Sequence, residues 1–229
     1  MQVELAQPWF DSALERLDVR RGNRLLTIDP SISEVVALRS VVGNSGQLSL
    51  VVQDRQIAEQ FAEHQWPNLT VFSHETTGGE TFGTHDSILV APRTGPLLPV
   101  ENYAQLIRNN LRPGGRFVID LPAQSMLPDL LTAWQELGWD EEQTQPLRGV
   151  TDLELTAATR KAGLRGVQSA LGSHLIHASS PAELAAAFAE PLAIDEEQIT
   201  ELGHAIVRVK KDSGPIDALV HRTQVGGQR

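Results

Sequence analysis

The chain of 229 residues contains no cysteine. It therefore has no disulfide, no thiolate nucleophile and no zinc–thiolate site. No run of residues approaches the roughly 18 apolar residues that a membrane-spanning helix needs. The first residues, MQVELAQPWFDSALERL, also lack the basic start and the apolar block of a signal peptide. We expect a cytoplasmic protein without a membrane partner and without a metal site.

Positive charge is scarce, because 19 Lys and Arg face 29 Asp and Glu, for a formal net charge of -10. Nucleic acids and anionic lipids bind through clustered Lys and Arg, so we expect no nucleic-acid partner. Five basic residues gather near the C-terminus. That pattern is more typical of a solvated helix face and tail than of a binding patch. The residues are Arg208, Lys210, Lys211, Arg222 and Arg229.

Several catalytic motifs are missing too. No GxGxxG follows an apolar run and no P-loop is present, which disfavours a nicotinamide dehydrogenase and a P-loop enzyme. The segment 43–46, GNSG, follows a predicted helix and precedes a predicted strand, the reverse of a nucleophile elbow. His174 and His177 have a spacing that would suit two metal ligands on a helix. Without an HExxH motif or a nearby acidic ligand, packing or surface roles are favoured.

What the chain does contain is a regular alternation of short apolar runs and amphipathic segments. The first unit covers Arg24 to Asp54: a strand at 25–28, a helix at 33–42 and a strand at 48–52. The apolar side of its helix is predicted to hold Val35, Val36, Leu38, Val41 and Val42. Helices at 8–18, 56–64 (with Ile57 and Phe61) and 103–111, and strands at 69–72, 87–91 and 116–121, surround this unit. Such alternation predicts a doubly wound α/β sheet, which binds ligands at the carboxyl ends of its strands.

Beyond residue 125 the pattern is less regular. We expect helices around 130–134, at 153–162, from 180 onward and over 199–209. The polar stretch 141–145 is predicted to be a loop. Short strands are predicted at 167–171 and 216–221.

Three segments together resemble class I S-adenosylmethionine-dependent methyltransferases. Residues 106–119, LIRNNLRPGGRFVI, are similar to the LkPGGrlvi segment before the family's fifth strand. Residues 86–90, DSILV, resemble its fDlVl fourth strand, and 162–167, AGLRGV, resemble its aGFr.v segment; order and spacing agree. The resemblance implies a Rossmann-like, mostly parallel seven-stranded sheet with helices on both faces and an antiparallel last strand. It also implies S-adenosylmethionine as cofactor.

On this basis we expect a single methyltransferase-like domain over residues 1–229. It would comprise an N-terminal helix in 1–20, a Rossmann-like core in 21–125, and C-terminal helices and closing strands in 126–229.

The cofactor loop is where the chain departs from the family. Aligned on vLDvGcGtG, the chain reads LLTIDPSIS, so that Asp29, Ser31 and Ser33 occupy the three glycine positions. Those glycines let the backbone approach the cofactor without a Cβ in the way. Residues 31–34, SISE, fit a helix capping box instead, with Glu34 as the reciprocal partner of Ser31. We favour the structural cap over a cofactor loop.

The other cofactor positions of the family leave alternatives open. Gln53 and Asp54 compete for the acidic position that binds the ribose, and Asp54 could equally cap the next helix. Glu75 corresponds to the residue that faces the adenine amino group, although an exposed loop carboxylate is the default interpretation.

Two further sites are candidates for catalysis or substrate binding. His85 and Asp86 could hold a general base, but we expect Asp86 to fix the strand start and His85 to be exposed. Arg93 could bind an anionic substrate, yet a solvated loop arginine is favoured. The sequence assigns no catalytic residue.

Two functions follow from the sequence. One is a divergent S-adenosylmethionine-dependent methyltransferase acting on a small-molecule substrate. The alternative is a catalytically inactive protein that keeps the fold as a binding or assembly module, with a protein partner. The recognised motifs belong to the scaffold and favour both equally.

Overall fold

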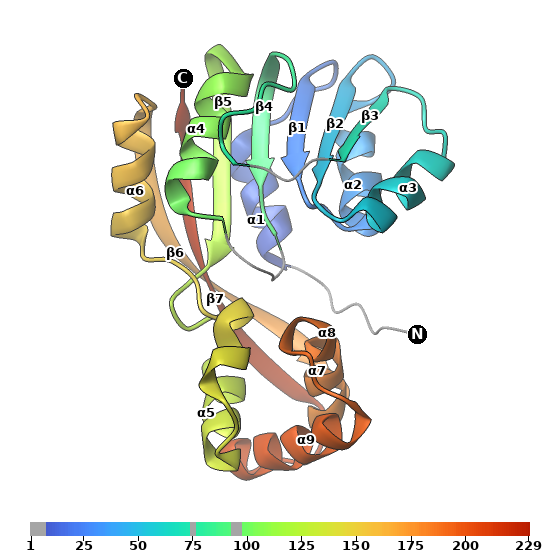
Figure 1. Cartoon of the computed structure of the whole chain (residues 1–229), viewed down its shortest axis with the longest axis vertical. Helices are drawn as coiled ribbons and strands as arrows, with labels where there is room; N and C mark the ends of the chain where they lie inside the picture. Colours follow the sequence, from blue (N-terminus) through green and yellow to red (C-terminus); the bar gives the residue numbers. More distant parts are fainter. Residues whose placement is uncertain (1–7, 74–76, 93–97) are drawn as a thin grey trace.

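The computed structural model describes residues 8–73, 77–92 and 98–229. Its centre is one seven-stranded sheet with the order β3-β2-β1-β4-β5-β7-β6 (Figure 1). The first five strands are mutually parallel, whereas β7 runs antiparallel to both of its neighbours. The predicted fold class, with its antiparallel last strand, is confirmed. The strands are β1 (Arg24–Ile28), β2 (Gln47–Val52), β3 (Leu69–Ser73), β4 (His85–Val90), β5 (Leu111–Pro122), β6 (Arg165–Ala178) and β7 (Ile216–Gln228).

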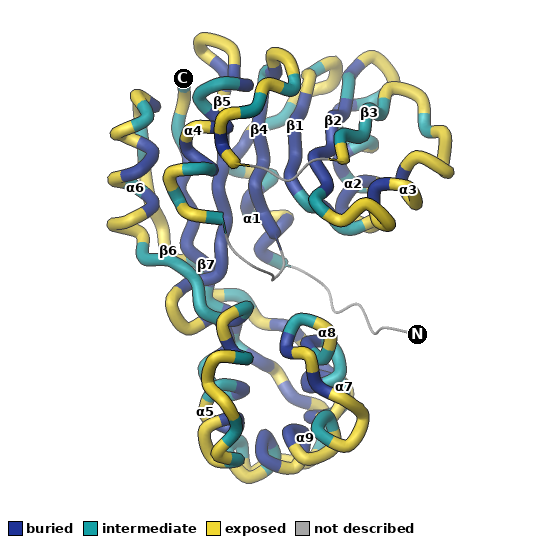
Figure 2. The backbone as a smooth tube through the Cα atoms, viewed as in Figure 1, coloured by how far each residue is buried: buried dark blue, intermediate teal, exposed yellow. Residues whose placement is uncertain are grey.

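Helices cover both faces of the sheet because the strands are apolar on both sides. In β1, Leu25 belongs to one hydrophobic cluster and Leu26 to another, as alternation along a strand requires. The first cluster contains α1 (Pro8–Leu17), α2 (Ile32–Val42) and α3 (Arg55–Glu63), and the second contains α4 (Val100–Asn110) and α6 (Asp152–Lys161). Figure 2 shows the central strands buried along their length and the outer turns of these helices exposed.

Two residues assigned to buried helix faces are exposed instead. Val36 on α2 is 52% exposed and Ile57 on α3 is 42% exposed. Each helix buries one stripe against the sheet, which passes through Val35 and Leu38 on α2 and through Phe61 on α3. The predicted apolar sides were wider than the contact that one sheet face can make with a helix.

A turn near the start of β5, where the register with β4 shifts, explains why the segment 113–115 contains proline and two glycines. Gly114 has φ 75°, in the left-handed region. A Cβ on Gly115 would lie 2.9 Å from the carbonyl oxygen of Asp86. The turn therefore needs these residues for packing of β5 against β4, whatever the chain binds.

A smaller lobe follows the carboxyl ends of the parallel strands (Figure 1). It contains α5 (Pro128–Leu137), α7 (Pro181–Ala187), α8 (Ala189–Leu192) and α9 (Glu196–Lys210), packed on the ends of β6 and β7 around their own hydrophobic cluster. Both strands extend well beyond the predicted 167–171 and 216–221. Strand β6 continues from the sheet into this lobe, whereas the additional residues of β7, 222–228, pair with β5 in the sheet.

One predicted loop in this region is regular. Residues 141–145 lie in the 3-10 helix η1 (Glu141–Leu147), which the Asp140 side chain caps by accepting from the Glu142 amide. Thr144 and Leu147 are buried, so the polar stretch packs against the lobe. Within the described residues, no helix combines the length and the apolar character needed to cross a membrane.

Candidate cofactor site at the carboxyl end of β1

Asp29, the residue directly after β1, has the backbone conformation of a glycine. Its φ is 45°, in the left-handed region that few side chains adopt; aspartate tolerates it better than most. Its amide donates to the carbonyl oxygen of Val51 at 2.8 Å, which continues the pairing of β1 with β2. The position that resembles the family's first glycine thus keeps a glycine-like backbone although it carries a carboxylate.

The Asp29 carboxylate links the ends of β1 and β2. It accepts from the Gln53 amide at 2.8 Å and from the Gln53 side-chain nitrogen Nε2 at 2.5 Å. Burial raises the pKa of Asp29 and outweighs these two bonds, which lower it; the charge of nearby Asp54 adds to the increase. Asp29 and Gln53 are therefore brought together, and they use their polar groups on each other.

The predicted capping box at the start of α2 is confirmed. The Ser31 hydroxyl accepts from the Glu34 amide at 3.3 Å, and the Glu34 carboxylate accepts from the Ser31 amide at 2.8 Å. Ser33 lies beside them, with its hydroxyl 3.0 Å from that of Ser31. Glu34 is only 6% exposed. The side chains at the second and third glycine positions thus serve or adjoin a helix cap.

Asp54 is the N-cap of α3. Its carboxylate accepts from the amides of Gln56 and Ile57, at 2.7 and 3.3 Å. Of the two residues that compete for the ribose position, one caps a helix and the other faces Asp29. Glu75, the candidate for the adenine, lies outside the described residues, as does Arg93.

These residues do not fit S-adenosylmethionine in the way that a glycine loop would. Side chains stand at all three glycine positions, and two of the amides next to β1 and β2 are already bonded to the carboxylates of Asp29 and Glu34. Both carboxylates would also repel the methionine carboxylate of the cofactor. At the end of β2, Gln53 contacts Asp29 where the family places a free acid.

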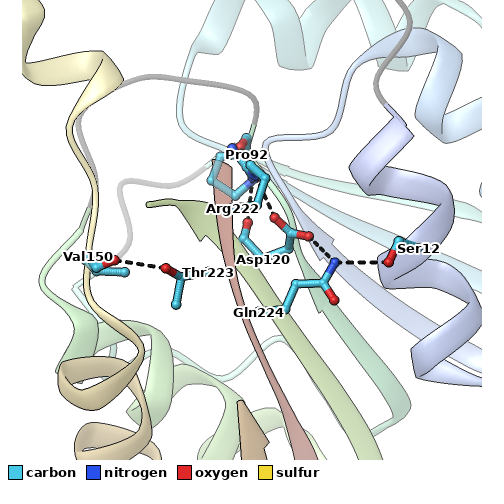
Figure 3. A network of polar contacts seen from close by, with 7 residues as sticks. All are labelled: Ser12, Pro92, Asp120, Val150, Arg222, Thr223 and Gln224. Carbon is cyan, nitrogen blue, oxygen red and sulfur yellow. Dashed lines mark hydrogen bonds and ion pairs between the residues drawn. The ribbon is translucent and has the colours of Figure 1, made fainter. Parts of the chain in front are cut away.

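A buried ion pair at the carboxyl end of β5 was not predicted from the sequence. Arg222 on β7 and Asp120 on β5 are both fully buried, with the guanidinium Nε 2.6 Å from the carboxylate. The same guanidinium donates to the carbonyl oxygen of Pro92 after β4, at 2.8 Å (Figure 3). The Gln224 side chain donates to the other Asp120 oxygen at 2.5 Å. This network joins β4, β5 and β7.

The pair also reaches α1, where the Arg222 guanidinium lies 5.1 Å from the centre of the Trp9 ring. The Asp120 carboxylate thus accepts from two side chains of β7, those of Arg222 and Gln224. One signal was available in the sequence: Asp120 interrupts a predicted apolar strand, and a charge buried there needs a partner.

His85 is buried, and the prediction of an exposed side chain was wrong. Its Nε2 lies 3.0 Å from the Ser49 hydroxyl on neighbouring β2, and burial lowers its pKa. Asp86 does fix the strand start, since it accepts from the Arg24 amide at 2.7 Å and pairs with Arg112 at 2.7 Å. Both residues lie at the amino end of β4, opposite the candidate site.

The C-terminal basic residues do not form one surface patch. Lys210 pairs with Asp129 at 2.9 Å, and Arg208 with Glu136 at 3.6 Å. Arg222 is buried, contrary to the expected solvated tail.

His174 and His177, whose spacing would suit two metal ligands on a helix, lie on strand β6. His177 pairs with Asp217 at 2.9 Å. Over residues 8–73, 77–92 and 98–229, no group of three or more His, Asp or Glu could hold a metal ion.

Comparisons with known proteins rest on structure alone. No protein-family model matches the sequence, and no curated protein matches it. The fold is similar to the YcgJ protein of Bacillus subtilis, with a TM-score of 0.64, 15% identity, and coverage of 96% of this chain and 97% of that one. It is also similar to an S-adenosylmethionine-dependent O-methyltransferase of Thermotoga maritima, with a TM-score of 0.57, 13% identity, and coverage of 99% and 67%.

A third similar structure is a putative methyltransferase of Haloferax volcanii, solved as a complex with the Trm112 methyltransferase activator. Its TM-score is 0.54 at 16% identity, and the match covers 96% of this chain and 90% of that one. At such identities the matches establish the fold. The chain has the fold of class I S-adenosylmethionine-dependent methyltransferases.

Proposed function

We propose that this chain, which has the class I methyltransferase fold, is a binding or assembly module that does not use S-adenosylmethionine. One observation carries the proposal: the Asp29 carboxylate is held by the amide and the side chain of Gln53 across the ends of β1 and β2. This contact occupies the edge at which open α/β sheets bind ligands.

Binding the cofactor there would require the contact to open. Hydrogen bonds to a charged group contribute about 1.5 to 3 kcal/mol each, so the cofactor would have to offset the loss of both. It would then place its own carboxylate near the Asp29 carboxyl group and the buried Glu34 carboxyl group at the start of α2. Both effects disfavour the usual binding mode.

Apolar side chains exposed near the same edge support a binding role. Ile32 and Val36 lie one turn apart on α2, and Ile57 lies in the first turn of α3; they are 44%, 52% and 42% exposed. A protein surface that leaves such side chains in water gains free energy when a partner covers them. The Haloferax volcanii complex is a case in which a protein of this fold binds another protein.

The other hypothesis, a divergent methyltransferase acting on a small molecule, rests on the fold. It would act mainly by holding the methyl donor and the nucleophile in line. It requires the donor to bind, and that step separates the two hypotheses.

The test is a titration of the full chain with S-adenosylmethionine and with its demethylated product, by calorimetry and by thermal unfolding. We expect no heat and no change in melting temperature. A cofactor at about 100 times its dissociation constant would stabilise the fold by about 2.7 kcal/mol, which thermal unfolding detects. A methyltransferase that binds the cofactor serves as positive control. Saturable binding of either compound would overturn the proposal and favour the enzyme.

A further inference from the structure

The sheet ends in a long edge strand, β6. It has 14 residues and pairs with β7, and no other described strand pairs with it. An edge strand carries a row of N–H and C=O groups without a partner strand, and another chain can pair with them.

Natural edge strands usually prevent such pairing with charged side chains, proline or bulges. After Arg165, however, no Lys, Arg, Asp or Glu occurs before Glu183, and no proline occurs within the strand. The single irregularity of its register lies at the start, between Arg165 and Gln168. Most of the strand therefore lacks the features that block pairing.

Strand β6 also leaves two large apolar side chains in water. Ile176 and Ala178 point into the core of the lobe, together with Val220 on β7. Leu171 and Leu175 alternate with them and lie on the other face, where they are 66% and 60% exposed. The helices of the lobe cover the first face and leave these two leucines uncovered.

We propose that β6 pairs with β6 of a second copy of this chain, antiparallel and about a two-fold axis at Ser173. In a two-fold interface, residue i of one copy meets residue j of the other and the reverse. With the axis at Ser173, Leu171 of each copy faces Leu175 of the other. The two-fold axis produces two equivalent pairs of leucines, so that all four exposed leucine side chains of the dimer are covered. The sheets of the two copies join into one continuous sheet.

The sequence around Ser173 distinguishes this register from its neighbours. If the axis moves by one residue to Gly172, Leu171 meets Ser173 and both leucine pairs are lost. With the axis at Ser173, Ser169 meets His177 of the second copy. The Ser169 hydroxyl lies 3.4 Å from the Asp152 carboxylate, so an imidazole would come near a negative charge. No like charges face each other, although each chain carries a net charge of -10.

The absence of cysteine allows a direct test of the register. Ser173→Cys introduces a single thiol on the axis, where facing Cα atoms of an antiparallel pair are about 4.5 to 5.5 Å apart. A disulfide spans about 4.4 to 6.8 Å between Cα atoms. Under mild oxidation, this variant should form a covalent dimer with high yield. Ser40→Cys, an exposed serine on α2, is the matched control and should remain a monomer on a denaturing gel.

The wild-type chain gives the second measurement. Light scattering after size-exclusion chromatography should yield twice the 25.0 kDa of one chain. Leu175→Lys should weaken the dimer at least about tenfold, because it removes both leucine pairs and adds the charge that blocks edges. Circular dichroism should show an unchanged monomer fold, since Leu175 is exposed in the monomer.

Three outcomes would overturn the inference: a monomeric wild-type chain, a dimer that Leu175→Lys leaves intact, or equal cross-linking of the Ser173→Cys and Ser40→Cys variants. A monomeric chain would leave the edge to a strand of a different protein. The proposed dimer does not depend on whether the chain binds S-adenosylmethionine. A result that contradicts the dimer therefore leaves the proposed function untouched, and the reverse also holds.

Discussion

At the scale of single residues, Asp29 combines the backbone conformation of a loop glycine with a carboxylate side chain. A side chain in the left-handed region costs of the order of 1 kcal/mol or more. Here the residue has φ 45°, and its amide and its carboxylate both bond to the end of β2. These contacts hold the strained backbone in place. The backbone of Asp29 thus keeps the conformation of a glycine. Its side chain, however, fills the space in which a cofactor could approach the backbone.

Asp29→Asn tests the buried charge. Burial raises the folded-state pKa of Asp29 above its unfolded value of about 3.9. The folded chain therefore binds the proton more tightly, and the wild-type protein loses stability as pH rises from about 3.9 through that raised pKa. The asparagine variant lacks this loss, and a rotated Gln53 amide can still bond to it.

Urea unfolding of both proteins, from below pH ~3.9 to neutral pH, measures the effect. The stability of Asp29→Asn relative to wild type should increase with pH, by about 1.4 kcal/mol for each unit by which the pKa is raised. A difference that stays constant over this range would contradict a buried, ionised Asp29.

At the scale of elements, the pair of Asp120 and Arg222 fixes β7 against β5. The two residues are 102 positions apart and carry no exposed surface. Such a pair is costly to bury, but removing one partner costs more, because the other charge is left without compensation.

Arg222→Met should destabilise the protein by about 3 to 5 kcal/mol, because it leaves the Asp120 carboxylate buried and unpaired. The matched control is Arg208→Met, which breaks the exposed pair with Glu136 and should cost less than about 1 kcal/mol. Chemical denaturation measures both. Equal costs would show that burial adds nothing to the ion pair.

Local signals in the sequence predicted most elements, and contacts between distant elements limited the rest. The capping box of Ser31 could be predicted, because its partner Glu34 lies three residues away. Burial of Arg222 and His85 was not, because Asp120 and Ser49 approach them only in the folded sheet. The full length of β6 depends on the lobe that covers its end, and that of β7 depends on its pairing with β5. At the site, the sequence indicated that Ser31 and Asp54 could cap helices. It did not predict the contact of Asp29 with Gln53, because that contact forms only when β1 pairs with β2.

At the scale of the whole molecule, β6 and β7 connect the sheet to the lobe. Each strand contributes to the sheet at one end and to the lobe cluster at the other. Trp9 at the start of α1 also packs into the lobe cluster. These continuous elements favour the expected single domain over residues 1–229, which remains a prediction.

Cooperative unfolding tests this prediction. Trp134 and Trp139 contact each other in the lobe at 4.9 Å between ring centres, whereas Trp66 packs beside α3 and β3. In a Trp66→Phe variant, tryptophan fluorescence therefore reports on the lobe and its contact with α1. For a single domain, its urea transition should coincide with the transition seen by far-ultraviolet circular dichroism. A separate, earlier fluorescence transition would instead identify the lobe as a second domain.

The place of β7 in the sheet has a consequence for synthesis. β7 follows β5 and β6 along the chain but lies between them. While the polypeptide is being translated, β6 has no strand beside it, and the lobe lacks Ile216, Ala218 and Val220 from its core. Contacts between distant segments are slow to form, and unpaired strands invite aggregation. The native pairing of β6 and the completion of the lobe core must therefore wait for the synthesis of β7.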